Sequence, residues 1–147
     1  MNLKWIRLAG LAMAFVFAVV GLLFLLIPGD ILKLFNRFSE PLDLPMAPLE
    51  NGVFFLALAA AYMYLVTLLA LLMARHPDNK GFPFLLANAK LSSAVFSLLL
   101  FVWRQPYLIC LANSVIDGMI GLAAGAIYLN VRRLPQTGRQ ETGHGHG

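Results

Sequence analysis

Four long apolar stretches, separated by short polar or proline-containing segments, dominate the pattern of the chain. They cover residues 8–27, 52–74, 82–103 and 107–131. At about 1.5 Å per residue, a helix of roughly 20 residues is as long as the hydrocarbon core of a bilayer is thick. The pattern therefore predicts an all-α membrane protein with four transmembrane helices, which form one bundle over residues 1–133.

The connections between these stretches predict how the helices pair. Only Arg104, Gln105 and Pro106 separate the third stretch from the fourth, and residues 75–81 form a short polar turn after the second. Helices joined by such short turns are antiparallel neighbours. We expect two antiparallel hairpins, one from each consecutive pair of stretches.

The longer connection, residues 28–51, combines residues that end helices with a short pattern that favours one. Pro28 and Gly29 end the first helix. Residues 30–39 then place apolar side chains at helical spacing, which fits either a short amphipathic helix in the membrane interface or a loop collapsed against the bundle. Prolines at 41, 45 and 48 predict an extended, irregular connector over 40–48.

The first stretch could also be interpreted as a signal peptide, because the basic residues Lys4 and Arg7 precede it. An uncharged run of 20 residues, 8–27, is too long for the apolar region of a signal peptide, and no small-x-small cleavage site follows it. We expect this stretch to be a retained first span.

Composition agrees with a lipid environment. Hydrophobic residues make up 60% of the chain and charged residues 12%, and mean hydropathy is +0.77. A soluble domain carries about twice that charged fraction. The net charge of +4 comes from basic residues at the ends of the apolar stretches, where they act as topology signals rather than as a nucleic-acid surface.

The distribution of Lys and Arg predicts the orientation. Seven basic residues lie on the side of the N-terminus, the 75–81 turn and the C-terminal tail, against three on the other side: Lys4, Arg7, Arg75, Lys80, Arg132, Arg133 and Arg139 against Lys33, Arg37 and Arg104. By the positive-inside rule both termini are cytoplasmic. With no organelle-targeting features, we expect the inner (plasma) membrane of a bacterium, and a flexible cytoplasmic tail over 134–147.

Two ionisable residues interrupt the last two stretches. Lys90 lies 15 residues before Gln105 and Asp117 lies 12 residues after it, so their depths differ by about 4.5 Å. A single charge in mid-bilayer costs at least about 2.5 to 3.5 kcal/mol. Two opposite charges at matched depth on neighbouring helices are therefore expected to pair.

Other polar and small residues share the faces of this predicted pair. Asn113, Asp117, Gly121 and Gly125 are spaced four apart, and the two glycines form a GxxxG pair that favours close helix packing. Around Lys90, side chains that could satisfy the remaining donors and acceptors are Asn88, Ser93, Ser97 and Asn113. These residues form a predicted intramembrane polar site.

The second stretch supplies three hydroxyl side chains, Tyr62, Tyr64 and Thr67. Tyr64 and Thr67 share a helical face with Ala60, so we expect them to point into the bundle. Tyr62 and Tyr64, together with Phe96 and Phe101, also suggest an aromatic groove between the second and third spans that would bind lipid or quinone.

Known catalytic and metal-binding patterns are missing from the sequence. No histidine lies within the four stretches, and Cys110 is the single cysteine, which argues against haem ligation, paired-cysteine chemistry and a thiolate cluster. No dinucleotide-binding, P-loop or zinc-protease motif occurs. We expect no catalytic residue, metal or cofactor.

Three functions follow as hypotheses. The favoured one is a non-enzymatic accessory or assembly subunit, working in the bilayer as a homo-oligomer or in a larger membrane complex. The alternative is a small oligomeric transporter or ion-coupled carrier that uses Lys90 and Asp117. The third is the lipid or quinone site.

Overall fold

The computed structural model describes residues 3–104 and 106–133, without the side chains of residues 50–53 and 55. Four long helices dominate it: α1 (Leu3–Leu26), α3 (Leu49–Arg75), α4 (Gly81–Trp103) and α5 (Leu108–Arg132). All four are long and apolar enough to cross a membrane, which confirms the predicted set of four apolar helices. The predicted flexible tail, 134–147, lies outside the described residues.

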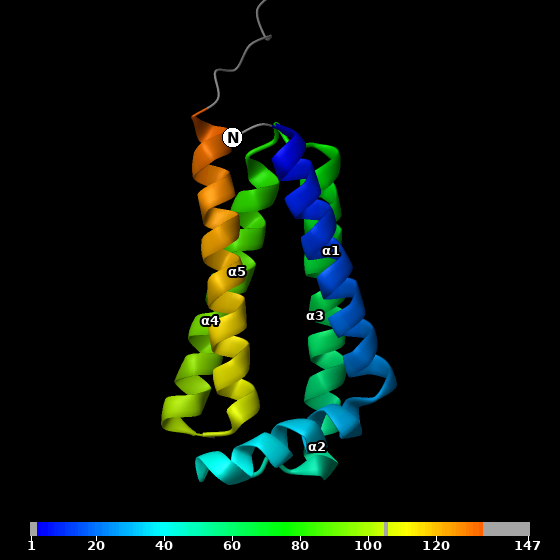
Figure 1. Ribbon diagram of the computed structural model, residues 1–147, viewed down its shortest axis with the longest axis vertical. Coiled ribbons are helices and arrows are strands. Elements are labelled where there is room, and N and C mark those ends of the chain that lie inside the picture. The colour runs from blue at the N-terminus through cyan, green and yellow to red at the C-terminus, as the bar shows by residue number, and fades with distance from the viewer. Residues whose placement is uncertain (1–2, 105, 134–147) are drawn as a thin grey trace, which may run out of the picture.

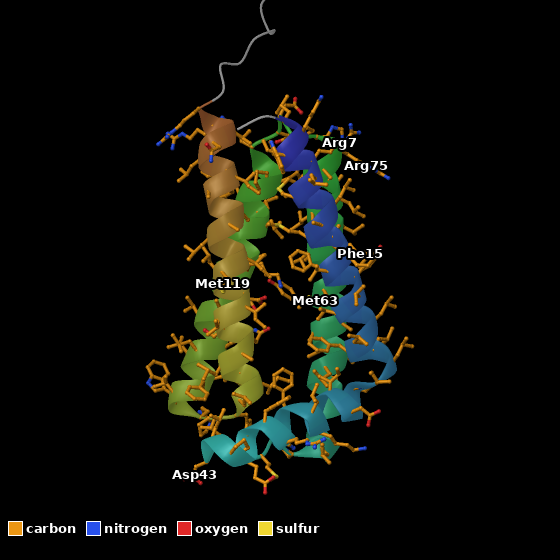
Figure 2. The ribbon with its side chains drawn as sticks, in the orientation of Figure 1. Arg7, Phe15, Asp43, Met63, Arg75 and Met119 are labelled. Carbon is orange, nitrogen blue, oxygen red and sulfur yellow. The ribbon has the colours of Figure 1, made fainter. Side chains whose placement is uncertain are left out.

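The long helices pack as two pairs, α1 along α3 and α4 along α5, with a smaller contact between α3 and α4 (Figure 1). Consecutive long helices run in opposite directions (Figure 1). Arg7 and Arg75 lie together at one end of the molecule, and Asp43 lies at the opposite end (Figure 2). These three charged residues thus lie at the two ends of the molecule.

Residues 28–39 form a helix, α2 (Pro28–Ser39), rather than a collapsed loop. Pro28 occupies the first turn, where its missing N–H costs no hydrogen bond, and Asp30 and Arg37 match the charges of the helix ends. The helix contacts both α3 and α5, so it lies across the end of both pairs (Figure 1). Leu32 is its buried apolar anchor.

The connector after α2 differs from the extended chain expected over 40–48. A 3₁₀ turn, η1 (Glu40–Leu42), continues from α2, and Asp43 reverses the chain with a positive φ of 52°. Asn36 then fixes the segment: its Nδ2 donates to the carbonyl of Ala47 at 2.9 Å, and the Ala47 N–H donates to Asn36 Oδ1 at 2.8 Å. The prolines prevent regular structure, but this paired hydrogen bond gives the segment a defined path.

Glycine allows the closest approach within the first helix pair. A Cβ added at Gly10 of α1 would lie 2.9 Å from the carbonyl oxygen of Ala70 and 2.9 Å from the backbone nitrogen of Ala74. Both atoms belong to the α3 backbone and cannot move aside like the end of a long side chain. Small residues therefore set the distance between α1 and α3.

Buried apolar side chains form two clusters. The larger combines all four long helices and includes Phe17, Met63, Leu86 and Ala124. The smaller lies where α2 meets α3 and consists of Leu32, Ala47 and Leu56. A buried ion pair borders the larger cluster, in the middle of the molecule.

Candidate functional site

Lys90 and Asp117 form an ion pair in the interior. The Nζ of Lys90 on α4 lies 2.8 Å from Oδ1 of Asp117 on α5, and the two residues are 0% and 2% exposed. Depth along neighbouring helices predicts such a pair, and the structure places the two groups within hydrogen-bond distance. Removing both charges from water is costly, so the attraction between them must offset a large desolvation penalty.

The ammonium group of Lys90 also contacts the other helix pair. Its Nζ lies 4.7 Å from the ring centroid of Phe17 on α1 and 5.0 Å from that of Tyr62 on α3. The Sδ of Met63, also on α3, is 3.9 Å away. Ring faces attract cations, and more strongly where water is excluded. Lys90 on α4 therefore touches side chains from each of the other three long helices. Met63 lies between the two pairs (Figure 2).

A neutral polar cluster lies about one helical turn from Asp117. The Nδ2 of Asn113 on α5 donates to Ser97 Oγ at 2.7 Å and to Ser93 Oγ at 3.3 Å, both on α4. The structure thus brings together five of the predicted polar residues: Lys90, Ser93, Ser97, Asn113 and Asp117. The ion pair and the Asn113 hydrogen bonds thus connect α4 to α5 at two positions about one helical turn apart.

Asn88 does not join this site. Its side chain is exposed, and its Nδ2 donates within α4 to the carbonyl of Phe84 at 3.5 Å. Asn88 is two residues from Lys90, which turns it about 200° around the helix axis. The expectation that Asn88 helps to satisfy the ion pair is therefore wrong.

The two glycines of the GxxxG pair have different surroundings. A Cβ at Gly121 would lie 2.8 Å from Cγ of Leu91 on α4 and 3.0 Å from its backbone nitrogen, whereas a Cβ at Gly125 would meet nothing within 4 Å. Close packing is present at Gly121, and the same expectation for Gly125 is wrong. Within the described part of the chain, Gly121 is therefore the glycine at which α4 approaches α5 most closely.

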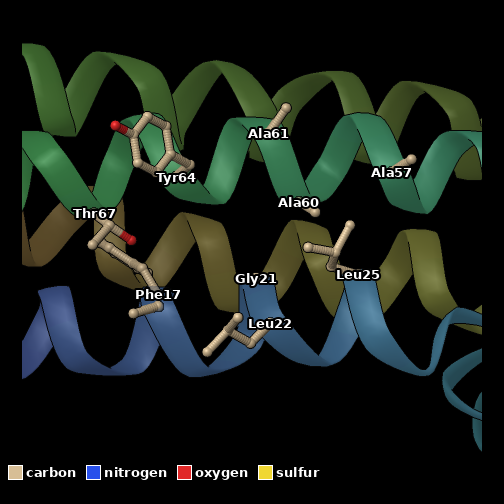
Figure 3. Close-up of a pocket in the computed structure, with 10 residues that line it drawn as sticks. Phe17, Gly21, Leu22, Leu25, Ala57, Ala60, Ala61, Tyr64 and Thr67 are labelled. Carbon is tan, nitrogen blue, oxygen red and sulfur yellow. The ribbon is translucent and has the colours of Figure 1, made fainter.

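The tyrosines of α3 also differ from expectation. Tyr64 is 67% exposed and lies with Thr67 on an outer groove against α1, so it does not point into the bundle (Figure 3). Tyr62 is half-buried, and its hydroxyl donates to the carbonyl of Ala89 on α4 at 2.8 Å. Phe96 is exposed. These aromatic residues therefore do not build one groove between α3 and α4.

Exchanging each tyrosine for phenylalanine tests this assignment. Tyr62→Phe is expected to lower the free energy of unfolding by about 1 kcal/mol, because one interhelical hydrogen bond is lost. Tyr64→Phe, the matched control, removes a hydroxyl that makes no hydrogen bond inside the described part of the chain. In the dissociated monomer it is expected to change the free energy of unfolding by less than about 0.5 kcal/mol. Thermal unfolding of both variants in detergent gives the comparison; equal losses would contradict it.

Sequence reasoning missed Phe17 and Met63 as contacts of Lys90. Both are apolar residues in apolar helices, so nothing in their spacing distinguishes them from lipid-facing neighbours. Tyr62 shares a face with Val66, Leu69 and Met73 at helical steps, and two of these three are fully buried. The other faces of α3 are equally apolar, so this spacing alone does not mark the inner side.

The arrangement is a buried ion pair beside a neutral amide and hydroxyl cluster. Within residues 3–104 and 106–133, no group of three or more His, Cys, Asp or Glu residues is placed to hold a metal ion. Comparison with protein-family models, with curated proteins and with solved structures finds no match.

Proposed function

We propose that this chain is a non-enzymatic accessory or assembly subunit of a complex in a bacterial plasma membrane. It crosses the bilayer four times as two antiparallel hairpins, with both termini in the cytoplasm. The four apolar helices support the crossings. The excess of Lys and Arg at the end that holds Arg7 and Arg75 supports the orientation.

In this proposal, the outer groove between α1 and α3 is the surface that binds a partner subunit. It has a volume of about 560 Å³ and an apolar lining in which small residues predominate, among them Ala18, Gly21, Ala57 and Ala61 (Figure 3). Tyr64 lies on its edge near the middle of α3, and its hydroxyl makes no hydrogen bond within the described part of the chain. Lipid tails offer no acceptor, whereas a transmembrane helix of a partner subunit could fill the groove and accept this hydrogen bond.

Native mass analysis after extraction in a mild detergent tests this proposal. We expect a defined assembly larger than the 16.2 kDa monomer. Ala61→Leu fills the groove and should release the monomer. Ala123→Leu enlarges an exposed alanine on the outer face of α5 and should leave the assembly intact. A stable lone monomer from the unmodified chain would overturn the proposal.

A second candidate is a small oligomeric transporter or ion-coupled carrier. The observation that favours it is a cavity of about 120 Å³ that reaches Lys90 and Asp117. With Cys110 replaced by serine, single cysteines at 90, 93, 113 and 117 would be exposed to a water-soluble thiol reagent from each side. Reaction from both sides supports a carrier, and no reaction from either side excludes a pathway through the pair.

A further inference from the structure

The cavity beside the ion pair lies between the two helix pairs. Its wall is mostly apolar, with Phe17, Val20 and Phe24 from α1, Phe35 from α2 and Ile109 and Ala112 from α5. A dry apolar cavity of roughly 150 Å³ accepts benzene in a well-studied case. At about 120 Å³, this cavity matches a single six-membered ring, and three phenylalanines line it.

Three polar residues, Lys90, Asn113 and Asp117, also line this cavity. The Oδ2 of Asp117 is a buried oxygen with no hydrogen-bond partner among the described residues. The amide nitrogen of Asn113 is engaged by the two serines, and its carbonyl oxygen has no partner in the same part of the chain. An unsatisfied buried carboxylate oxygen costs free energy, and a donor would recover it.

The charges of the site determine what kind of donor fits. Lys90 and Asp117 neutralise each other at 2.8 Å, so a ligand with a net charge would bring an uncompensated charge into the interior. A neutral hydroxyl group supplies the missing donor without that cost. Oδ2 exposes less than 1 Å². Because the terminal torsion of an aspartate is soft, rotation of the carboxylate is the movement that contact between this oxygen and a ligand requires.

The lining of the cavity reaches the outer surface of the molecule between α1 and α5. Val16 on α1 and Ile116 on α5 both line it, and they are 49% and 56% exposed. Each of these helices packs mainly on its own partner, α3 or α4, so the α1–α5 seam is the open side. A ligand that enters here arrives from the lipid phase and is itself an amphiphile.

We propose that this cavity binds the head of a neutral aromatic alcohol, a phenol-type ring on an apolar tail, that enters from the bilayer between α1 and α5. The ring packs among Phe17, Phe24 and Phe35, and its hydroxyl donates to Oδ2 of Asp117. This site lies on the inner side of α1 and does not rest on the proposed assembly role of the outer groove.

The test uses the full chain in phosphatidylcholine nanodiscs with two matched probes. 4-Hexylphenol carries the hydroxyl donor, and 4-hexylanisole replaces it by a methyl ether. At equal mole fraction in the bilayer, tenfold above the Kd of the phenol, the phenol is expected to raise Tm by about 3 to 5 °C. The anisole is expected to raise it by less than about 1 °C.

Two variants locate the effect. Ala112→Phe fills the cavity and should abolish the response to 4-hexylphenol. Val115→Phe adds the same ring to an exposed position of α5 and should preserve the response. Equal shifts with both probes would overturn recognition of the hydroxyl, and no shift with either would overturn the site. A response that persists in Ala112→Phe would overturn its location; if that variant does not fold, the two probes on the unmodified chain still decide.

Discussion

Replacing Lys90 with methionine is expected to lower the free energy of unfolding by about 3 to 5 kcal/mol, because it leaves Asp117 buried without its counter-charge. Asp117→Leu should cost a similar amount by leaving the ammonium unpaired. The double variant should lose less than either single variant, since a well-packed apolar pair carries no desolvation penalty. This non-additivity is the signature of a direct pair.

Reversible unfolding in mixed micelles, followed by circular dichroism, measures this cycle. Asn88→Leu is the control, because it removes a polar side chain from the same helix on its exposed face. It is expected to change the free energy of unfolding by less than about 0.5 kcal/mol. Additive losses in the double variant would show that Lys90 and Asp117 contribute independently, which contradicts a direct ion pair.

A second large effect is expected at Gly10. Gly10→Ala should destabilise the fold by about 1 to 3 kcal/mol, because the new methyl group would lie 2.9 Å from backbone atoms of α3 and would force α1 outward. Gly125→Ala is the matched control, with nothing within 4 Å of the added atom. There the better helix propensity of alanine should stabilise the fold by about 0.5 to 1 kcal/mol.

The two variants are unfolded under identical conditions. Their changes in the free energy of unfolding will have opposite signs if packing, rather than helix propensity, sets the distance between α1 and α3. Two stabilised variants would mean that α1 can move away at no cost. In that case the close contact at Ala70 and Ala74 would not be a fixed feature of the fold.

Sequence reasoning succeeds here where a feature depends on position along a helix. Apolar runs of membrane length predict the four long helices, and residue counts from Gln105 place Lys90 and Asp117 at matching depth. Both arguments use only the fixed rise of the α-helix. The structure then places the two charged groups in contact.

Reasoning about helix faces succeeds less often. Every face of α3 is apolar, so the sequence offers no polar stripe that marks its outer side. The helical spacing predicts Tyr64 in the interior, whereas Tyr62 occupies it. The residues around the Lys90 ammonium on α1 and α3 show the same difficulty. Such contacts depend on how two helix pairs rotate against each other, which no local pattern records.

The surroundings of Lys90 also bear on how the chain is made. Lys90 precedes Asp117 by 27 residues in the chain, so the third apolar helix leaves the ribosome before the fourth helix can supply the carboxylate. Phe17, Tyr62 and Met63, which contact its ammonium, have been synthesised by then. The first two long helices can therefore contact the Lys90 ammonium first, and the fourth helix then adds the Asp117 carboxylate.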